Sequence, residues 1–184
     1  SAWDGMVEVD GVKLKRIIEH TGLKQGQSVL DVGTGTGVMV PLLRQAVGPG
    51  GRVVAVDVAE NMVAIARQKF GGLADFYVAD AQVLPFPAGS FDCILCYSVF
   101  PHFTDKAAVL KTLAAGLKPG GCIIVAHAAG RDQINSFHDS LNNFVAGDQL
   151  PADDVMISLA GQNGLYALHR GGGVPLQQAF GHDS

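Results

Sequence analysis

The stretch Val29–Gly37, which reads V-L-D-V-G-T-G-T-G, decides the fold of this chain. The apolar, β-branched run from Ser28 to Val32 predicts a buried strand, and the glycines end it abruptly before a helical pattern that begins near Thr36. The three glycines let the backbone turn sharply and leave no side chain between it and a ligand at the carboxyl end of the strand. The stretch therefore predicts a strand, a tight ligand-binding loop and a helix.

The chemistry of the loop narrows the choice of ligand. Dinucleotide-binding loops have the spacing G-x-G-x-x-G and aim a helix N-terminus at a pyrophosphate, whereas the spacing here is G-x-G-x-G. Asp31, just before the loop, would repel a phosphate and suits a ligand with a cationic amino group, such as S-adenosylmethionine. A purely structural turn would also need glycine, so the triplet alone leaves that interpretation open.

Four segments of the chain carry a resemblance to a known family. D-V-G-T-G-T-G at 31–37 resembles motif I of the class I S-adenosylmethionine-dependent methyltransferases. A-Q-V-L-P-F-P-A-G-S-F-D at 81–92 resembles the loop before the fourth strand in ubiquinone-type C-methylases and their small-molecule relatives. V-F-P-H-F-T-D at 99–105 and K-P-G-G at 118–121 resemble later family segments, the second as a turn into the fifth strand. The resemblance implies an S-adenosylmethionine cofactor and a small-molecule methyl acceptor.

Strands and helices alternate along the chain, which predicts an α/β fold with a doubly wound, mostly parallel, Rossmann-like sheet. We expect one domain over residues 1–184, with a helical insert at about 131–162 that covers the substrate in this fold. Further strands are expected at 52–56, 76–79, 93–98, 122–126 and 165–169, and helices at 131–145 and 153–160. The resemblance adds a seventh, reversed strand, but the glycines at 171–173 predict that it is short or absent.

Carboxylates follow two of the expected strands. Asp57 lies twenty residues beyond the last glycine of the loop, where an acid accepts hydrogen bonds from ribose hydroxyls. The alternative is that Asp57 caps the helix that starts near Glu60. The resemblance implies that Asp80 meets the adenine amino group, and Met62 is a second candidate contact of the adenine.

The expected cofactor contacts lie in the glycine loop and at the strand ends: Asp31, Gly33, Thr34, Gly35, Gly37, Asp57, Val58, Met62, Asp80, Ala81, Gln82, Tyr97 and Ser98. The acceptor pocket is expected to be lined by Tyr97, Phe100, His102 and the helix at 131–145, in which Ile134, Phe137, Leu141 and Phe144 point inward. These residues favour an apolar or aromatic acceptor over a polyanion.

Three histidines are the candidate catalytic residues: His102, His127 and His138. Their positions after two strands and in the covering helix predict that two or three imidazoles converge, and one could act as a general base. His127 is favoured because a strand end is held more rigidly than a loop. The histidines could instead only cap strand ends. No His or Cys spacing is typical of a zinc site, so no metal is expected.

Composition excludes several other classes of protein. A net charge of −4 without a basic stripe argues against a nucleic-acid surface. No apolar run reaches 18 residues and no signal peptide is evident, which predicts a cytoplasmic protein without a membrane span. Cys93, Cys96 and Cys122 fall in strands and are expected to be buried thiols, with Cys93 and Cys96 on opposite faces.

Two alternative functions stay open from the sequence. An NAD-dependent oxidoreductase is disfavoured by Asp31 and by the glycine spacing. A non-catalytic module that binds S-adenosylmethionine or a nucleotide is compatible with the abbreviated C-terminal pattern. The sequence does not indicate the oligomeric state.

Overall fold

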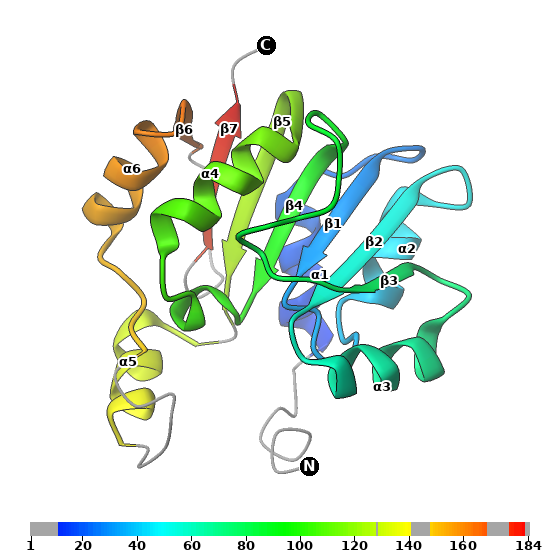
Figure 1. The fold of residues 1–184 in the computed structure, drawn as a ribbon, viewed down its shortest axis with the longest axis horizontal. Coiled ribbons are helices and arrows are strands. Elements are labelled where there is room, and N and C mark those ends of the chain that lie inside the picture. The colour runs from blue at the N-terminus through cyan, green and yellow to red at the C-terminus, as the bar shows by residue number, and fades with distance from the viewer. Residues whose placement is uncertain (1–10, 128, 141–147, 169–176, 183–184) are drawn as a thin grey trace.

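The computed structural model describes residues 11–127, 129–140, 148–168 and 177–182 (Figure 1). In chain order its elements are α1 (Gly11–Thr21), β1 (Ser28–Val32), α2 (Val40–Val47), β2 (Arg52–Asp57), α3 (Glu60–Phe70), β3 (Asp75–Val78), β4 (Phe91–Tyr97), the 3-10 helix η1 (Phe100–His102), α4 (Lys106–Gly116), β5 (Leu117–Ala126), α5 (Arg131–Asp139), α6 (Asp153–Gly161), β6 (Leu165–Leu168) and β7 (Gln177–His182).

The strands form one seven-stranded sheet in the order β3-β2-β1-β4-β5-β7-β6. The first five strands are parallel, and β7 runs antiparallel to both β5 and β6. The predicted doubly wound, mostly parallel sheet is therefore confirmed. The expectation of a short or absent last strand is wrong, because β7 is six residues long and lies inside the sheet, between β5 and the edge strand β6. The hydrophobic pattern of the residues that follow the glycines at 171–173 does not reveal that this segment pairs with β5 and β6.

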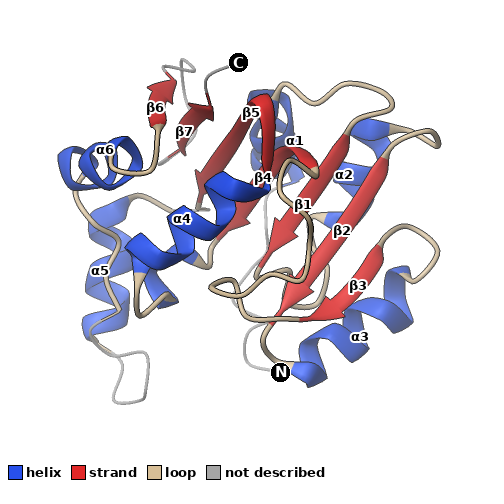
Figure 2. Cartoon of the chain, turned by 45° about the horizontal axis from the view of Figure 1, so that its top comes forward, coloured by secondary structure: helices blue, strands red, loops and turns tan. Residues whose placement is uncertain are grey.

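Helices cover both faces of the sheet (Figure 2). On one face Ile94 of β4 clusters with Leu110 of α4, and α6 joins the same cluster. On the other face the neighbouring residue Leu95 clusters with Ile17 of α1, and α2 packs beside it. The central strands are hence buried on both sides, which explains their nearly continuous apolar sequence. The same alternation places Cys93 and Cys96 on opposite faces, as expected.

The helix after the glycine loop begins later than the sequence predicts. Residues 35–39 form turns, and α2 starts at Val40 rather than near Thr36. Pro41 then falls in the first turn, where its missing N–H and fixed φ are tolerated. Proline therefore sets the start of this helix, and the loop is longer than its hydrophobic pattern suggests.

The K-P-G-G segment at 118–121 is not the turn that the resemblance implies. Helix α4 ends at Gly116, and β5 already starts at Leu117, which pairs with Phe91 before the register shifts. A Cβ atom on Gly121 would lie 2.9 Å from the Lys118 carbonyl oxygen, so the chain needs glycine there to stay close to its neighbours. The segment is an irregular start of β5 rather than a separate connection.

Smaller differences concern the other predicted elements. β3 is shifted by one residue from the prediction, and the helix expected at 131–145 is described as α5, over Arg131–Asp139. Leu141 and Phe144 lie outside the described residues, as does the end of the predicted strand at His169. The helix expected at 153–160 is confirmed as α6 (Asp153–Gly161), and the strand expected at 165–169 is confirmed over its described part as β6 (Leu165–Leu168).

Gly33 provides a direct test of the packing around the loop. Its φ is +70°, and an added Cβ would run into the side chain of Val99. We expect Gly33→Ala to lower the free energy of unfolding by about 2–4 kcal/mol, from left-handed backbone strain plus overpacking. Urea denaturation measures this loss.

Gly35→Ala is the matched control. Its φ is +54°, but no atom lies within 4 Å of the added Cβ. We expect only the backbone strain, about 1 kcal/mol. Adding Val99→Ala should restore part of the stability that Gly33→Ala loses. Equal losses for the two glycine variants would contradict this account of the loop.

Candidate active site

The glycine loop is fastened to the carboxyl end of β2. The N–H groups of Gly33 and Thr34 both donate to the Val56 carbonyl oxygen, at 2.9 and 3.0 Å. The N–H of Gly35 donates to Asp57 Oδ2 at 2.9 Å. The loop is therefore preformed, and the open space beside the Gly35 Cα leaves its backbone accessible to a ligand.

The Asp57 side chain connects the glycine loop to the start of α3. Its Oδ1 accepts a hydrogen bond from the N–H of Ala59, the residue before α3, while Oδ2 holds the glycine loop. Asp57 therefore supports the start of the helix without occupying the N-cap position itself. Each carboxylate oxygen has a second lone pair, so the side chain can still accept a hydrogen bond from a ligand.

Asp57 also lines a cavity of about 230 Å³, which we call the glycine-loop cavity. Six of the expected cofactor contacts line it: Gly33, Asp57, Val58, Asp80, Ala81 and Gln82. Seven further lining residues were not expected there: Val32, Val56, Ala79, Val99, His102, Phe103 and Thr104. The remaining expected contacts are not among its lining residues: Asp31, Thr34, Gly35, Gly37, Met62, Tyr97 and Ser98.

Asp31 lies beneath the loop rather than on its surface. Only 1% of the residue is exposed, and Oδ2 accepts a hydrogen bond from Thr34 Oγ1 at 2.7 Å. Burial raises the pKa of Asp31 to about 7, and the negative charge of Asp57 adds to that effect, while the Thr34 hydrogen bond opposes it. Asp31 is thus a carboxyl group whose charge near neutral pH depends on its surroundings.

Two aromatic residues expected in the acceptor pocket belong to the core. Tyr97 packs in the cluster on the α1 face, and Phe100 is fully buried in the cluster on the α4 face. Ser98, between them, has a φ of +54° and is the one non-glycine residue with positive φ in the described ranges. Its N–H donates to the Ala126 carbonyl oxygen at 2.8 Å, so the strained residue ties the end of β4 to β5.

A second cavity, which we call the histidine cavity, has a volume of about 190 Å³. Its lining residues come from the ends of β4 and β5, from η1 and from α5: Ser98, Pro101, His102, His127, Ala129, Gln133, Ile134, Phe137 and His138. The three candidate histidines therefore converge on one cavity. His102 lines both cavities, and so stands where they adjoin.

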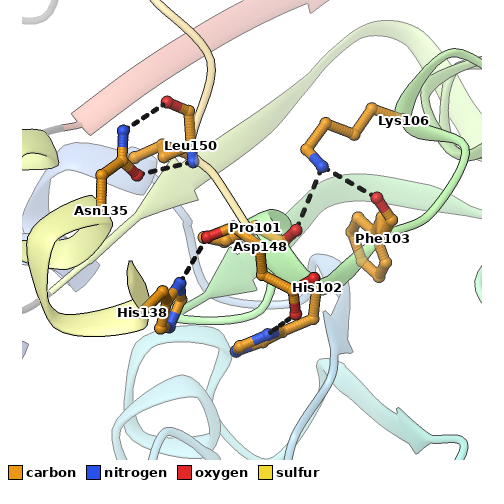
Figure 3. A network of polar contacts seen from close by, with 8 residues as sticks. All are labelled: Pro101, His102, Phe103, Lys106, Asn135, His138, Asp148 and Leu150. Carbon is orange, nitrogen blue, oxygen red and sulfur yellow. Dashed lines mark hydrogen bonds and ion pairs between the residues drawn. The ribbon is translucent and has the colours of Figure 1, made fainter. Parts of the chain in front are cut away.

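Two of the histidines are held by one residue, Asp148 (Figure 3). His102 Nδ1 lies 2.7 Å from Asp148 Oδ2, and His138 Nδ1 lies 2.7 Å from the backbone carbonyl oxygen of Asp148. The two imidazole rings are 5.0 Å apart between centroids. Sequence reasoning missed Asp148 because it follows no strand and belongs to no motif.

His127 has a different environment. The residue is 2% exposed, and within the described part of the chain no group hydrogen-bonds to its Nε2. Burial lowers the pKa of His127 to about 4, helped by repulsion from His102 and His138. The imidazole is therefore neutral at neutral pH.

The cations near the histidine cavity have other partners. Lys106 Nζ donates to the carbonyl oxygens of Pro101 and Phe103, and burial lowers the pKa of Lys106. Arg131 pairs with Asp153 at 2.9 Å. Over the described ranges, no three His, Cys, Asp or Glu side chains are placed to hold a metal ion, and no helix is long and apolar enough to cross a membrane.

Comparison with known proteins assigns a family to this arrangement. A family model described as "Methyltransferase domain" matches residues 29–121. A ubiquinone/menaquinone biosynthesis C-methyltransferase of Saccharophagus degradans is 39% identical over 113 residues, which make up 59% of this chain and 45% of that relative. The chain thus spans about half the length of the curated relatives it matches.

Solved structures share the fold. A SAM-dependent methyltransferase from Aquifex aeolicus is 22% identical with a TM-score of 0.74, over 97% of this chain and 94% of that one. A Haloferax volcanii methyltransferase, solved in complex with the Trm112 activator, is 24% identical with a TM-score of 0.78, over 90% of this chain and 73% of that one.

The raised pKa of Asp31 predicts a pH-dependent stability. Between the ordinary carboxyl pKa of 3.8 and about 7, folded Asp31 keeps a proton that the unfolded chain releases. Asp31 therefore makes stability fall as pH rises through this window. Asp31→Asn removes the effect, so its free energy of unfolding relative to wild type should rise by about 1 kcal/mol or more between pH 4 and pH 8.

Urea denaturation across this pH range measures the difference. Asp75→Asn is the control, because Asp75 is an exposed partner of Arg52. Its effect should stay within about 0.5 kcal/mol at each pH. A difference between Asp31→Asn and wild type that does not change with pH would show that Asp31 does not titrate in this window.

Proposed function

The chain belongs to the methyltransferase domain family, in the class I branch of ubiquinone C-methylase-like enzymes, and on this premise we propose that it transfers a methyl group from S-adenosylmethionine to a small-molecule acceptor. The observation that carries the proposal is the pair of adjoining cavities at the carboxyl edge of the sheet. One is lined by the glycine loop and two carboxylates, and the other by three histidines and apolar side chains. Ligands of open α/β sheets bind at this edge.

The residues present fit the proposed cofactor. The glycine-loop cavity offers the Asp57 carboxylate for ribose hydroxyls and the Asp80 carboxyl group for the adenine amino group. The open face of Gly35 leaves room beside the loop. Asp31 lies buried beneath the loop and does not line the cavity, so the charge it carries once it ionises acts on an ammonium group through space and not by direct contact. When bound, S-adenosylmethionine supplies a methyl group on a sulfonium, which is already activated toward nucleophiles.

The remaining work of the chain is to position the acceptor and exclude water. The histidine cavity supplies Ile134 and Phe137 as apolar walls, and the neutral His127 as a hydrogen-bonding group. Lys106 and Arg131 are engaged elsewhere, so the cavity suits a neutral, apolar or aromatic acceptor rather than a polyanion. In this proposal His102, His127 and His138 are the candidate catalytic residues.

The proposal includes a reducing compartment, the cytoplasm, because Cys93, Cys96 and Cys122 are all buried thiols rather than disulfides.

Isothermal titration tests the cofactor part. We expect S-adenosylmethionine and S-adenosylhomocysteine to bind and NAD to bind at least about tenfold more weakly. Tighter binding of NAD would overturn the assignment in favour of an oxidoreductase. Methyl transfer from labelled S-adenosylmethionine to a panel of small aromatic acceptors tests catalysis, and binding without any transfer would favour a non-catalytic module.

Asp57→Ala tests the ribose contact. We expect S-adenosylhomocysteine to bind about ten- to a hundredfold more weakly, from the loss of charge-assisted hydrogen bonds worth about 1.5–3 kcal/mol. Because Asp57 also holds Gly35 and Ala59, Asp57→Asn is measured beside it, and circular dichroism checks that both variants fold.

Asp75→Ala is the matched control for Asp57→Ala. Asp75 lies at the start of the neighbouring strand β3, and does not line the glycine-loop cavity. The Asp75→Ala variant should therefore bind S-adenosylhomocysteine with an unchanged dissociation constant. If a folded Asp57→Ala protein binds S-adenosylhomocysteine as tightly as the wild type, the role of Asp57 is purely structural.

A further inference from the structure

Residues 148–150 form a short strap that is hydrogen-bonded to η1 and α5, two elements that help to line the histidine cavity (Figure 3). Asp148 contacts His102 and His138, and the Gln149 side chain donates to the carboxylate of Asp139. Leu150 exchanges two hydrogen bonds with the Asn135 side chain, and its own side chain is buried in the core. The position of Asp148 is therefore fixed by its neighbours and not only by its own contacts.

The two contacts of Asp148 determine which ring nitrogen carries the proton. A carboxylate oxygen and a carbonyl oxygen are both acceptors, so Nδ1 of His102 and Nδ1 of His138 must each donate. In the neutral imidazoles Nε2 then lacks a proton and is an acceptor. A single residue thus sets the same tautomer in two histidines that line one cavity.

The two histidines differ in what stabilises a positive charge. His102 faces the carboxylate of Asp148, whereas His138 faces only a backbone carbonyl of the same residue. His127 has no carboxylate partner in the described part of the chain, and burial disfavours its charged form. Among the three, His102 is also the one that lines both cavities.

We propose that Asp148 is a positioning residue that fixes His102 as the proton acceptor of the site, and that the methyl acceptor presents a neutral hydroxyl or N–H group to it. In the hydroxyl case the proton moves to Nε2 of His102, and the electron pair of the O–H bond stays on the acceptor oxygen. The imidazolium that forms is held against the carboxylate of Asp148. This inference rests on the proposed methyl transfer and gives it a class of substrate.

The tautomers are measured first, without cofactor or acceptor, by long-range ¹H–¹⁵N NMR of the histidine rings at about two pH units above the pKa of a free imidazole. We expect His102 and His138 to carry their protons on Nδ1 in the wild type. In Asp148→Ala, which removes the acceptor, His102 should lose its preference for Nδ1–H, while His138 keeps it because the backbone carbonyl remains. Asp148→Asn still presents an amide oxygen to Nδ1, so His102 should keep its tautomer in that variant.

Asp139→Asn is the matched control, since Asp139 is bound to the same strap but is not the partner of either histidine. It should leave both tautomers unchanged. The proposal is overturned if His102 carries its proton on Nε2 in the wild type, or if Asp148→Ala does not change its tautomer. A simultaneous change at His138 in Asp148→Ala would also overturn it, because the carboxylate would then only hold the strap in place.

The class of acceptor is tested with phenol and toluene, which differ in a hydroxyl group. The histidine cavity, at about 190 Å³, suits a single ring, since an apolar cavity of about 150 Å³ binds benzene. With S-adenosylhomocysteine bound, wild type should bind phenol about fivefold more tightly than toluene, as one hydrogen bond predicts. Asp148→Ala should lose most of this preference and keep its affinity for toluene; equal preference in Asp148→Ala and the wild type would contradict the proposal.

The two proposals fail in different ways. If the wild type does not bind S-adenosylhomocysteine, the proposed function is contradicted. The tautomer measurement is still valid in that case, because it uses neither cofactor nor acceptor. Normal cofactor binding with an unchanged His102 tautomer in Asp148→Ala would contradict only the role of Asp148.

Discussion

The parallel pairing of β1 with both β2 and β4 is the constraint on which the rest of the structure depends. It brings the carboxyl ends of the three strands to one edge, so that the loops that follow them must share a small space. The backbone of Gly33 and Thr34 meets this constraint by bonding to Val56, and the absence of a side chain on Gly33 lets Val99 close over the loop. The glycine-loop cavity lies where these strand ends and loops meet.

The sequence predicts the part of the site that depends on local order. Gly33, Asp57 and Asp80 come directly after strands, so their convergence follows from the direction of the sheet alone. The meeting of the histidines was also foreseeable, because His102 and His127 follow neighbouring strands. Asp148 was not, because its contact with His102 spans 46 residues and depends on how a strap without regular structure packs.

The fold, like the site, could be predicted from the sequence only where local sequence patterns determine it. Hydrophobic runs locate the central strands, but they do not show that Pro41 delays a helix or that Leu117 already belongs to a strand. Tertiary packing decides these boundaries. The electrostatics of the site likewise come from burial: the pKa values of Asp31 and His127 move in opposite directions, and each move favours the uncharged group. A site with neutral polar groups and apolar walls distinguishes one ligand from another by hydrogen-bond geometry more than by charge.

The position of β7 has a consequence for the order in which the protein is assembled. β6 precedes β7 in the chain but borders only β7 in the sheet. During synthesis, the backbone groups of β6 and of the edge of β5 that later pair with β7 therefore stay unpaired until β7 emerges and inserts between the two strands. This interval is the period in which a nascent chain would be most prone to pair with another copy, and a chaperone that shields the edge of β5 would be most useful then.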